Sequence, residues 1–191
     1  PVMRAYPLTH HANPGKVDRV AALLPEFQRA AKLTQAWQYQ RLLRGDGLWN
    51  RADPKHVATL LSERYKRSVL NQVVGGLSSW VEITKGEFRA IVSKSSLPAD
   101  VKRDLYRINV RAAWYAPTLE LPELAVGDDG KERKTGRTLP VPTDTLKFAR
   151  RIVKHVKRHR NHLPNLARCR TMMLDGPVAR FETGKTNTFN Y

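Results

Sequence analysis

Cysteine, long apolar runs and a secretion signal are scarce or missing in this 191-residue chain. The single cysteine, Cys169, excludes an internal disulfide framework and fits a reducing compartment. No segment approaches about 18 consecutive apolar residues, the length typical of a membrane-spanning helix. The opening PVMRAYPLTHH also lacks the apolar run of a secretion signal. We therefore expect a cytoplasmic protein that has no membrane partner.

Acidic residues are also few, because 17 aspartates and glutamates face 34 lysines and arginines, which gives a formal charge of +17. This imbalance is larger than solubility requires, so the expected partner is a polyanion. Nucleic acid is favoured over an anionic membrane, because no basic amphipathic helix stands beside a lipidation motif. An apolar share of 41% is enough to bury a core.

Catalytic motifs are missing too, since the chain has no GxxxxGK, GxSxG or HExxH pattern. Its acidic residues are scattered, without the pairing that two-metal chemistry needs. We expect no catalytic residue, no metal site, no cofactor and no small-molecule substrate in this segment, whose role is binding.

Periodic apolar residues predict several helices. Steps of three and four from Val17 to Ala31 predict a helix over 16–44, which Pro25 should kink or divide. A second helix is predicted from about residue 54 to residue 82. The residues of its apolar stripe are His56 or Val57, Leu60 or Leu61, Tyr65, Val69, Val73, Leu77 and Trp80.

Two shorter helices should follow, TKGEFRAIVSKS with Thr84 as its cap and SLPADVKRDLYRINVRAAWY with a proline in its first turn. Residues 116–141 are rich in proline and glycine and predict a mobile loop or a short hairpin with DDGK at its tip. PTDTLKFARRIVKHVKRHRNHLP predicts a last helix with a threonine or aspartate cap and an end before Pro164. VMRAY near the start and the segment after residue 164 are strand-like. The expected fold is mainly α, with a helical bundle inserted between strands from both chain ends.

The last predicted helix carries the densest positive charge, and no acidic residue interrupts residues 145–163. Its cations, which we predict to bind RNA or phosphate, are Lys147, Arg150, Arg151, Lys154, Lys157, Arg158 and Arg160. At about 100° per residue, Lys147, Arg151, Lys154 and Arg158 share one face. His155, His159, His162 and Cys169 were weighed as zinc ligands, but the pattern lacks a cysteine pair and the surrounding cations oppose a dication.

A polar cluster opens the stretch RYKRSVLNQVVGGLSSW, residues 64–80. Arginine pairs with guanine and asparagine or glutamine with adenine in the major groove, while Val73 and Trp80 would anchor the opposite face. The residues predicted to read a duplex are Lys66, Arg67, Ser68, Asn71 and Gln72.

RSVLNQVVGGLSSW after a long helical pair is similar to the amino-terminal pattern of the TnpB group of transposon-encoded RNA-guided nucleases and of the type V CRISPR effectors related to them. The frame of an opening MRAYPL and a closing FETGKTNTFNY resembles the same family. The chain opens at Pro1 without an initiator methionine and closes within a strand-like run, so we expect a piece of a longer protein.

The resemblance implies a wedge strand in 1–15, a helical recognition lobe in 16–163, and wedge strands in 164–191 that continue beyond the chain end. It implies guide RNA and double-stranded target DNA as partners, with the polar cluster reading a short target-adjacent motif and the lobe holding the guide–target heteroduplex. A RuvC-like nuclease domain that uses Mg²⁺ would lie outside this chain. The basic helix and the loop before it exceed the minimal transposon pattern and suggest an enlarged, CRISPR-type lobe.

Two alternatives remain open on the sequence alone. A transcription regulator could use residues 55–80 as a helix-turn-helix, although the predicted helix is long and has no short glycine turn splitting it. A structural RNA-binding protein of the ribosomal type would also explain the charge.

Overall fold

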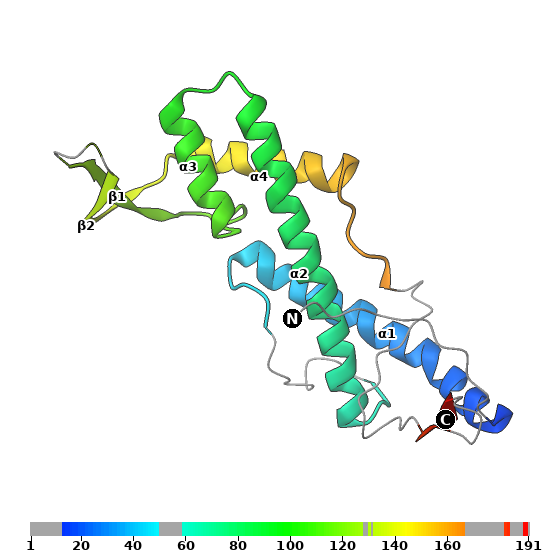
Figure 1. Ribbon diagram of the computed structural model, residues 1–191. Coiled ribbons are helices and arrows are strands. Elements are labelled where there is room, and N and C mark those ends of the chain that lie inside the picture. The colour runs from blue at the N-terminus through cyan, green and yellow to red at the C-terminus, as the bar shows by residue number, and fades with distance from the viewer. Residues whose placement is uncertain are drawn as a thin grey trace. The chain divides into compact units, whose positions relative to one another are not determined.

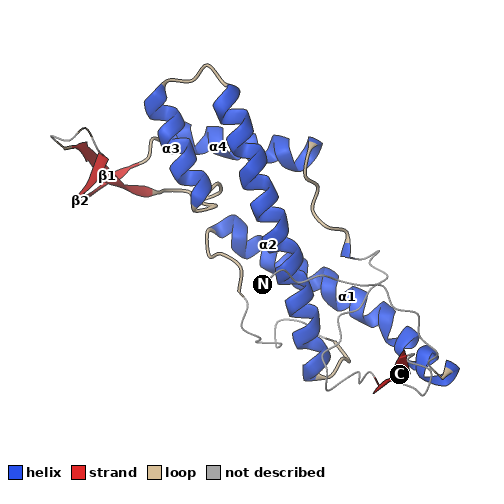
Figure 2. Cartoon of the chain, in the orientation of Figure 1, coloured by secondary structure: helices blue, strands red, loops and turns tan. Residues whose placement is uncertain are grey.

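The computed structural model describes residues 13–49, 59–127, 130, 132–166, 182–183 and 189–190. Within these residues the fold is mainly α with a small antiparallel β element, as predicted (Figures 1 and 2). The elements in chain order are α1 (Pro14–Arg44), α2 (Glu63–Lys94), α3 (Ala99–Val110), β1 (Glu120–Val126), β2 (Glu132–Pro140), α4 (Thr143–His159), β3 (Glu182–Thr183) and β4 (Phe189–Asn190).

The chain divides into two compact units. Unit 1 comprises residues 1–35, 50–73 and 165–191, and unit 2 comprises residues 36–49 and 74–164. Both units therefore contain part of α1 and part of α2. The predicted wedge and recognition lobe stay predictions. The strand-like VMRAY falls outside the described residues, and Pro14 and Gly15 of the predicted wedge strand 1–15 belong to α1. Near the chain end, β3 pairs with β4 in an antiparallel ladder.

Unit 2 is built around a core shared by α2, α3 and α4. Trp80, Phe88 and Val92 of α2 meet Leu105 and Ile108 of α3, and all five are buried. The other buried members of this core are Leu42, Val81, Trp114, Leu121, Val141, Leu146, Ala149, Ile152, Val153 and Val156. Burial of this many large apolar side chains is the main stabilising term of the unit.

Two asparagines hold the polar groups of this core. The Asn161 side chain donates to the Trp80 carbonyl and to the Thr84 hydroxyl, both at 2.9 Å, while the Trp80 indole donates to the Asn161 carbonyl at 2.8 Å. Asn109 donates to the Lys85 carbonyl at 2.9 Å and accepts from the Trp114 indole at 3.0 Å. Buried polar groups need such partners, because an unpaired one costs free energy.

In unit 1 the buried residues include Phe27 of α1, Val69 of α2 and Leu61, which precedes α2. The Glu26 carboxylate accepts hydrogen bonds from the Thr59 hydroxyl and from the Leu60 amide. It also pairs with Arg29 at 2.7 Å. The hydrogen bonds from Arg29 and Thr59 lower the pKa of Glu26 from 4.5 to about 2.

Three sequence expectations about helix ends were wrong. Of the two alternatives for Pro25, division is wrong, because α1 is continuous from Pro14 to Arg44, while a kink stays a prediction. Thr84 does not start a helix, because α2 runs on to Lys94 and Thr84 is buried inside it. The cap of α4 is neither Thr143 nor Asp144: Pro142 precedes the helix, and no side chain caps it.

Other expectations hold. Leu61, Val69, Val73, Leu77 and Trp80 of the predicted stripe are buried. Of the alternatives at 116–141, the hairpin is present, with β1 and β2 pairing antiparallel. The proposed tip DDGK lies partly outside the described residues, as do the stripe candidates at 56 and 57.

Candidate nucleic-acid interface

The amphipathic helix α4 separates its apolar and basic side chains. Leu146, Ala149, Ile152, Val153 and Val156 are buried in the core of unit 2. The predicted basic face, Lys147, Arg151, Lys154 and Arg158, is exposed along its whole length. The sequence prediction that these four cations share a solvent-facing surface is therefore confirmed. We call these four residues the α4 basic face.

The α4 basic face has little negative charge beside it. Asp144 is the single acidic residue in α4, and its carboxylate lies 3.2 Å from the Lys147 ammonium. Both side chains are well exposed, so the pair contributes little to stability. The rise along the helix axis from residue 147 to residue 158 is about 16 Å. One strand of a DNA duplex carries a phosphate about every 3.4 Å along its axis, so this length spans about five phosphates.

Arg150 has a different position from its neighbour Arg151. Its guanidinium donates to the main-chain carbonyls of Ala116 at 2.8 Å and Tyr115 at 3.3 Å. The side chain is half-buried and joins α4 to the segment between α3 and β1. Arg150 therefore has a structural role, because its hydrogen bonds connect α4 to residues 115 and 116. The sequence analysis did not assign this role to it.

Lys157 is also used within unit 2. Its ammonium donates to the Tyr39 hydroxyl at 2.9 Å and lies 4.4 Å from the centre of the Tyr39 ring. Burial raises the pKa of Tyr39 and that of Tyr115, so both phenols stay neutral. The contact therefore combines a charge-assisted hydrogen bond with a cation–π interaction.

The remaining predicted cation, Arg160, follows the last residue of α4 and pairs with Glu87 at 2.8 Å. Both side chains remain substantially exposed. The pair can therefore exchange partners at small cost in free energy. Of the seven predicted cations, the four of the α4 basic face and Arg160 are exposed, whereas Arg150 and Lys157 are half-buried.

The polar cluster at the start of α2 lies in unit 1. Arg67 and Asn71 are exposed and one helical turn apart. Lys66 pairs with Glu63 at 2.8 Å, and Gln72 is half-buried. Ser68 is only 3% exposed, so its hydroxyl is not accessible to a base edge in this structure. Arg67 and Asn71 are therefore the exposed side chains of this cluster.

The sequence analysis missed a second group of cations, on α3 and the hairpin. Lys102, Arg103, Arg107 and Arg111 recur along or just after α3 at helical spacing, which was a usable pattern. Lys134 joins them from β2, and its position depends on a strand irregularity that periodicity does not reveal. This group lines a groove between α3 and the β1–β2 hairpin.

His155 and His159 lie on the exposed surface of α4 with ring centres 4.8 Å apart. Among the described residues, no group of three or more histidine, cysteine, aspartate or glutamate side chains is arranged to hold a metal ion. Cys169 lies outside those residues. None of the helices in the described part of the chain combines the length and apolar character that crossing a membrane requires.

No protein-family model, curated protein or solved structure matches this chain.

Proposed function

We propose that this chain binds nucleic acid and that the α4 basic face contacts the phosphate backbone. The observation that carries this proposal is the position of Lys147, Arg151, Lys154 and Arg158, four exposed cations opposite a buried apolar stripe. Nucleic-acid phosphates release counterions when such cations neutralise them, which makes this kind of surface a binding site.

An ordinary solvated helix face would be arranged differently. Lys147 and Arg151, like Lys154 and Arg158, are like-charged pairs separated by four residues. Such pairs destabilise a helix by a few tenths of a kcal/mol each, and oppositely charged pairs would stabilise it by a similar amount. The α4 basic face retains these repulsive pairs, and the whole chain has a net charge of +17. Both features are expected of a surface that binds an anionic partner.

The wider proposal follows the resemblance to the TnpB-like and type V RNA-guided effectors. In this proposal the chain is the guide-RNA and target-DNA binding portion of such an effector. Arg67 and Asn71 read a short duplex motif, because they are accessible on α2 and match the side chains that bind guanine and adenine in the major groove. Guide RNA and heteroduplex are held through their backbone.

The helix-turn-helix alternative is less well supported. The alternative needs two short helices joined by a tight turn within residues 55–80, but residues 63–80 all belong to the uninterrupted α2 and residues 59–62 are not helical.

A salt titration tests the proposal. Lys147, Arg151, Lys154 and Arg158 are changed together to glutamine, and binding of a fluorescent duplex and of a structured RNA is measured between about 50 and 200 mM salt. Four lost contacts should reduce the slope of log affinity against log salt by about 3 to 4 for duplex DNA.

A matched control removes the same charge elsewhere. Arg19, Lys32, Arg89 and Lys94 are exposed on α1 and α2, so their joint change to glutamine alters net charge equally. We expect a clearly smaller change in slope for this control. Equal slopes for the two variants would show that binding is diffuse and that the α4 basic face has no special role.

A further inference from the structure

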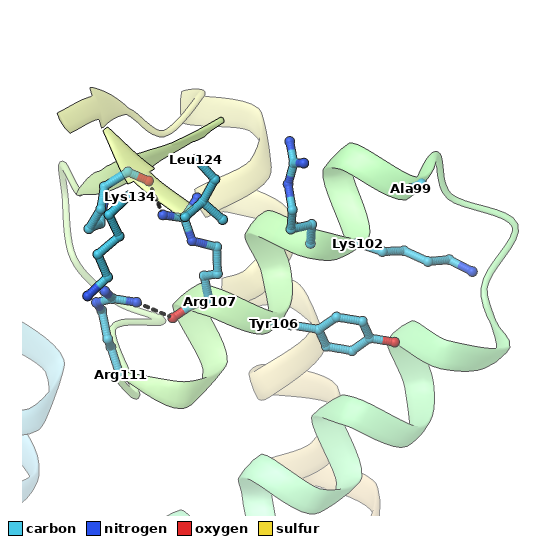
Figure 3. Close-up of a pocket in the computed structure, with 9 residues that line it drawn as sticks. Ala99, Lys102, Tyr106, Arg107, Arg111, Leu124 and Lys134 are labelled. Atoms are coloured by element: carbon cyan, nitrogen blue, oxygen red, sulfur yellow. Dashed lines mark hydrogen bonds between the residues drawn. The ribbon is translucent and has the colours of Figure 1, made fainter. Parts of the chain in front are cut away.

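Unit 2 contains an open groove between α3 and the β1–β2 hairpin (Figure 3). Its volume is about 530 Å³, within the range of sites that hold small ligands or single nucleotides. The hairpin forms one wall and the exposed side of α3 forms the floor. No part of the α4 basic face lines it.

The lining combines positive charge with an apolar floor. None of the lining side chains is acidic, and five are cations: Lys102, Arg103, Arg107, Arg111 and Lys134. The other lining residues are Ala99, Tyr106, Pro122 and Leu124. A groove of this composition suits a ligand that presents both anionic groups and a flat apolar surface.

Arg107 fixes the hairpin wall to α3. Its guanidinium donates to the Pro122 carbonyl of β1 and lies 3.6 Å from Asp104. Arg111 in turn donates to the Arg107 carbonyl at 3.2 Å. The two hydrogen bonds, drawn as dashed lines in Figure 3, hold Arg107 and Arg111 in place before any ligand arrives. Such preorganisation lowers the entropic cost of binding.

Lys134 reaches the groove because the hairpin register shifts. Pro122 pairs with Thr138, and a regular ladder would then place Gly136 opposite Leu124. The observed partner of Leu124 is Lys134, two residues before Gly136 in β2. Gly136 lies within the irregularity at a φ of 85°, a conformation that favours glycine. The irregularity therefore places a lysine beside the groove.

Tyr106 supplies the aromatic surface of the floor. Its side chain is half-buried, and it packs against the core of unit 2. Figure 3 shows Tyr106 and Lys102 extending from one side of α3, while Arg107, Arg111 and Lys134 lie toward the hairpin. A ligand that covers the groove would thus meet Tyr106 and Lys102 at one side of α3 and Arg107, Arg111 and Lys134 toward the hairpin.

We propose that this groove binds a single-stranded polynucleotide, with a base stacked on Tyr106 and adjacent phosphates on Arg111 and Lys134. A single strand exposes unstacked bases, which proteins bind on aromatic side chains within basic grooves. A duplex keeps its base faces covered and would leave the apolar floor unused. A small inorganic anion would also leave it unused.

This inference extends the proposed nucleic-acid binding to a second surface and to a particular form of the ligand. Single-stranded RNA and single-stranded DNA share the chemistry used here, so both are tested. The experiment separates the groove from the α4 basic face by comparing probes that carry bases with probes that do not.

The test measures fluorescence anisotropy of the 191-residue chain with labelled dT12, rU12 and a 12-unit abasic strand of equal charge. The wild type should bind a base-carrying strand about tenfold more tightly than the abasic strand, as one stacked base predicts. Tyr106→Ala should abolish that preference and Tyr106→Phe should keep it. The comparison of dT12 with rU12 identifies the preferred sugar.

Two readouts protect the result against misfolding of the alanine variant. Lys134 is exposed on β2, so Lys134→Gln should leave the far-ultraviolet spectrum unchanged and reduce the salt slope for dT12 by about 0.7. A strand with 5-iodouracil should crosslink in the wild type to the peptide that contains Tyr106. The proposal is overturned if folded Tyr106→Ala keeps the preference, or if crosslinks map outside residues 99–134.

Failure of the α4 proposal would look different. Neutralising the α4 basic face should weaken the base-carrying and abasic strands by the same factor and leave their ratio at about ten. If that variant changes neither affinity while Tyr106→Ala removes the preference, the groove binds nucleic acid and the α4 basic face does not.

Discussion

The neighbouring residues Arg150 and Arg151 offer a sharp test of how the α4 cations are used. The two side chains have the same chemistry and adjacent positions in one helix. Arg150 donates to the carbonyls of Ala116 and Tyr115, whereas Arg151 is exposed. We therefore expect their changes to glutamine to affect two different measurements.

Arg150→Gln should lower the stability of unit 2. Hydrogen bonds from a charged donor contribute about 1.5 to 3 kcal/mol, and the change leaves the carbonyl of the buried Ala116 without its partner at 2.8 Å. We expect a loss of about 1.5 to 3 kcal/mol in the free energy of unfolding. Arg151→Gln should stay within about 0.5 kcal/mol of the wild type, as exposed substitutions usually do.

Tryptophan fluorescence can follow this unfolding selectively. All four tryptophans, Trp37, Trp49, Trp80 and Trp114, belong to unit 2. Their emission during a urea titration therefore reports on the unit that contains α4. Binding is measured separately, without urea. Anisotropy titrations at several salt concentrations give, for each variant, the slope of log affinity against log salt.

The binding measurement should show the opposite order. Arg151→Gln should reduce the salt slope by about 0.7 to 0.9, the contribution of one phosphate contact, and Arg150→Gln should leave it nearly unchanged. If Arg150→Gln reduces the slope as much as Arg151→Gln does and leaves the urea curve unaltered, our division of the α4 cations is mistaken.

Two other predictions concern unit 1. Because hydrogen bonding lowers the pKa of Glu26 to about 2, its stabilising contribution should be complete above pH 4.5 and disappear as the pH falls toward 2. The difference in urea midpoint between the wild type and Glu26→Gln, followed by far-ultraviolet ellipticity, should shrink over that interval; a constant difference would contradict it. Arg67→Ala and Asn71→Ala should each cost about 1 to 3 kcal/mol in binding duplexes that carry the preferred flanking motif. A library of randomised flanking sequences that yields an equally sharp motif for wild type and both variants would show that these side chains do not read bases.

The sequence predicted helix positions better than helix ends. The stripe that begins at Val69 and Val73 continues through Trp80, Thr84 and Phe88 at steps of three and four, so the pattern itself was uninterrupted. The capping-box pattern at Thr84 suggested a break, but its hydroxyl accepts a hydrogen bond from Asn161, 77 positions away. A contact that distant cannot be read from local spacing.

Pro25 shows a similar limit. Proline removes one amide donor from a helix and leaves the carbonyl four residues earlier without its usual partner. In α1 both Pro25 and Ala21 are exposed, so water can satisfy that carbonyl. The cost is then small enough for packing of Phe27, Ala30 and Ala31 to keep the helix continuous.

A helical wheel drawn from the sequence already separates the α4 basic face from Arg150 and Lys157. Relative to Lys147, positions 151, 154 and 158 lie within about 40°, whereas positions 150 and 157 lie about 60° and 80° to one side, at 100° per residue. Cations at such a border can reach polar groups at the edge of the core, as Arg150 and Lys157 do. What the wheel could not supply was the identity of those groups, since Ala116 and Tyr39 lie in other parts of the chain.

The groove was beyond reach of sequence reasoning for a related reason. A basic stripe on α3 was visible, but a stripe alone is a solvated surface. It becomes a groove because the hairpin stands beside it, and that position depends on the contact of Arg107 with the Pro122 carbonyl. The lysine that completes the groove depends in turn on the register shift at Gly136. The contact of Arg107 is made to a main-chain carbonyl, and the register shift is a change in main-chain pairing. Because every residue carries these main-chain groups, the type of side chain does not reveal which of them will be used.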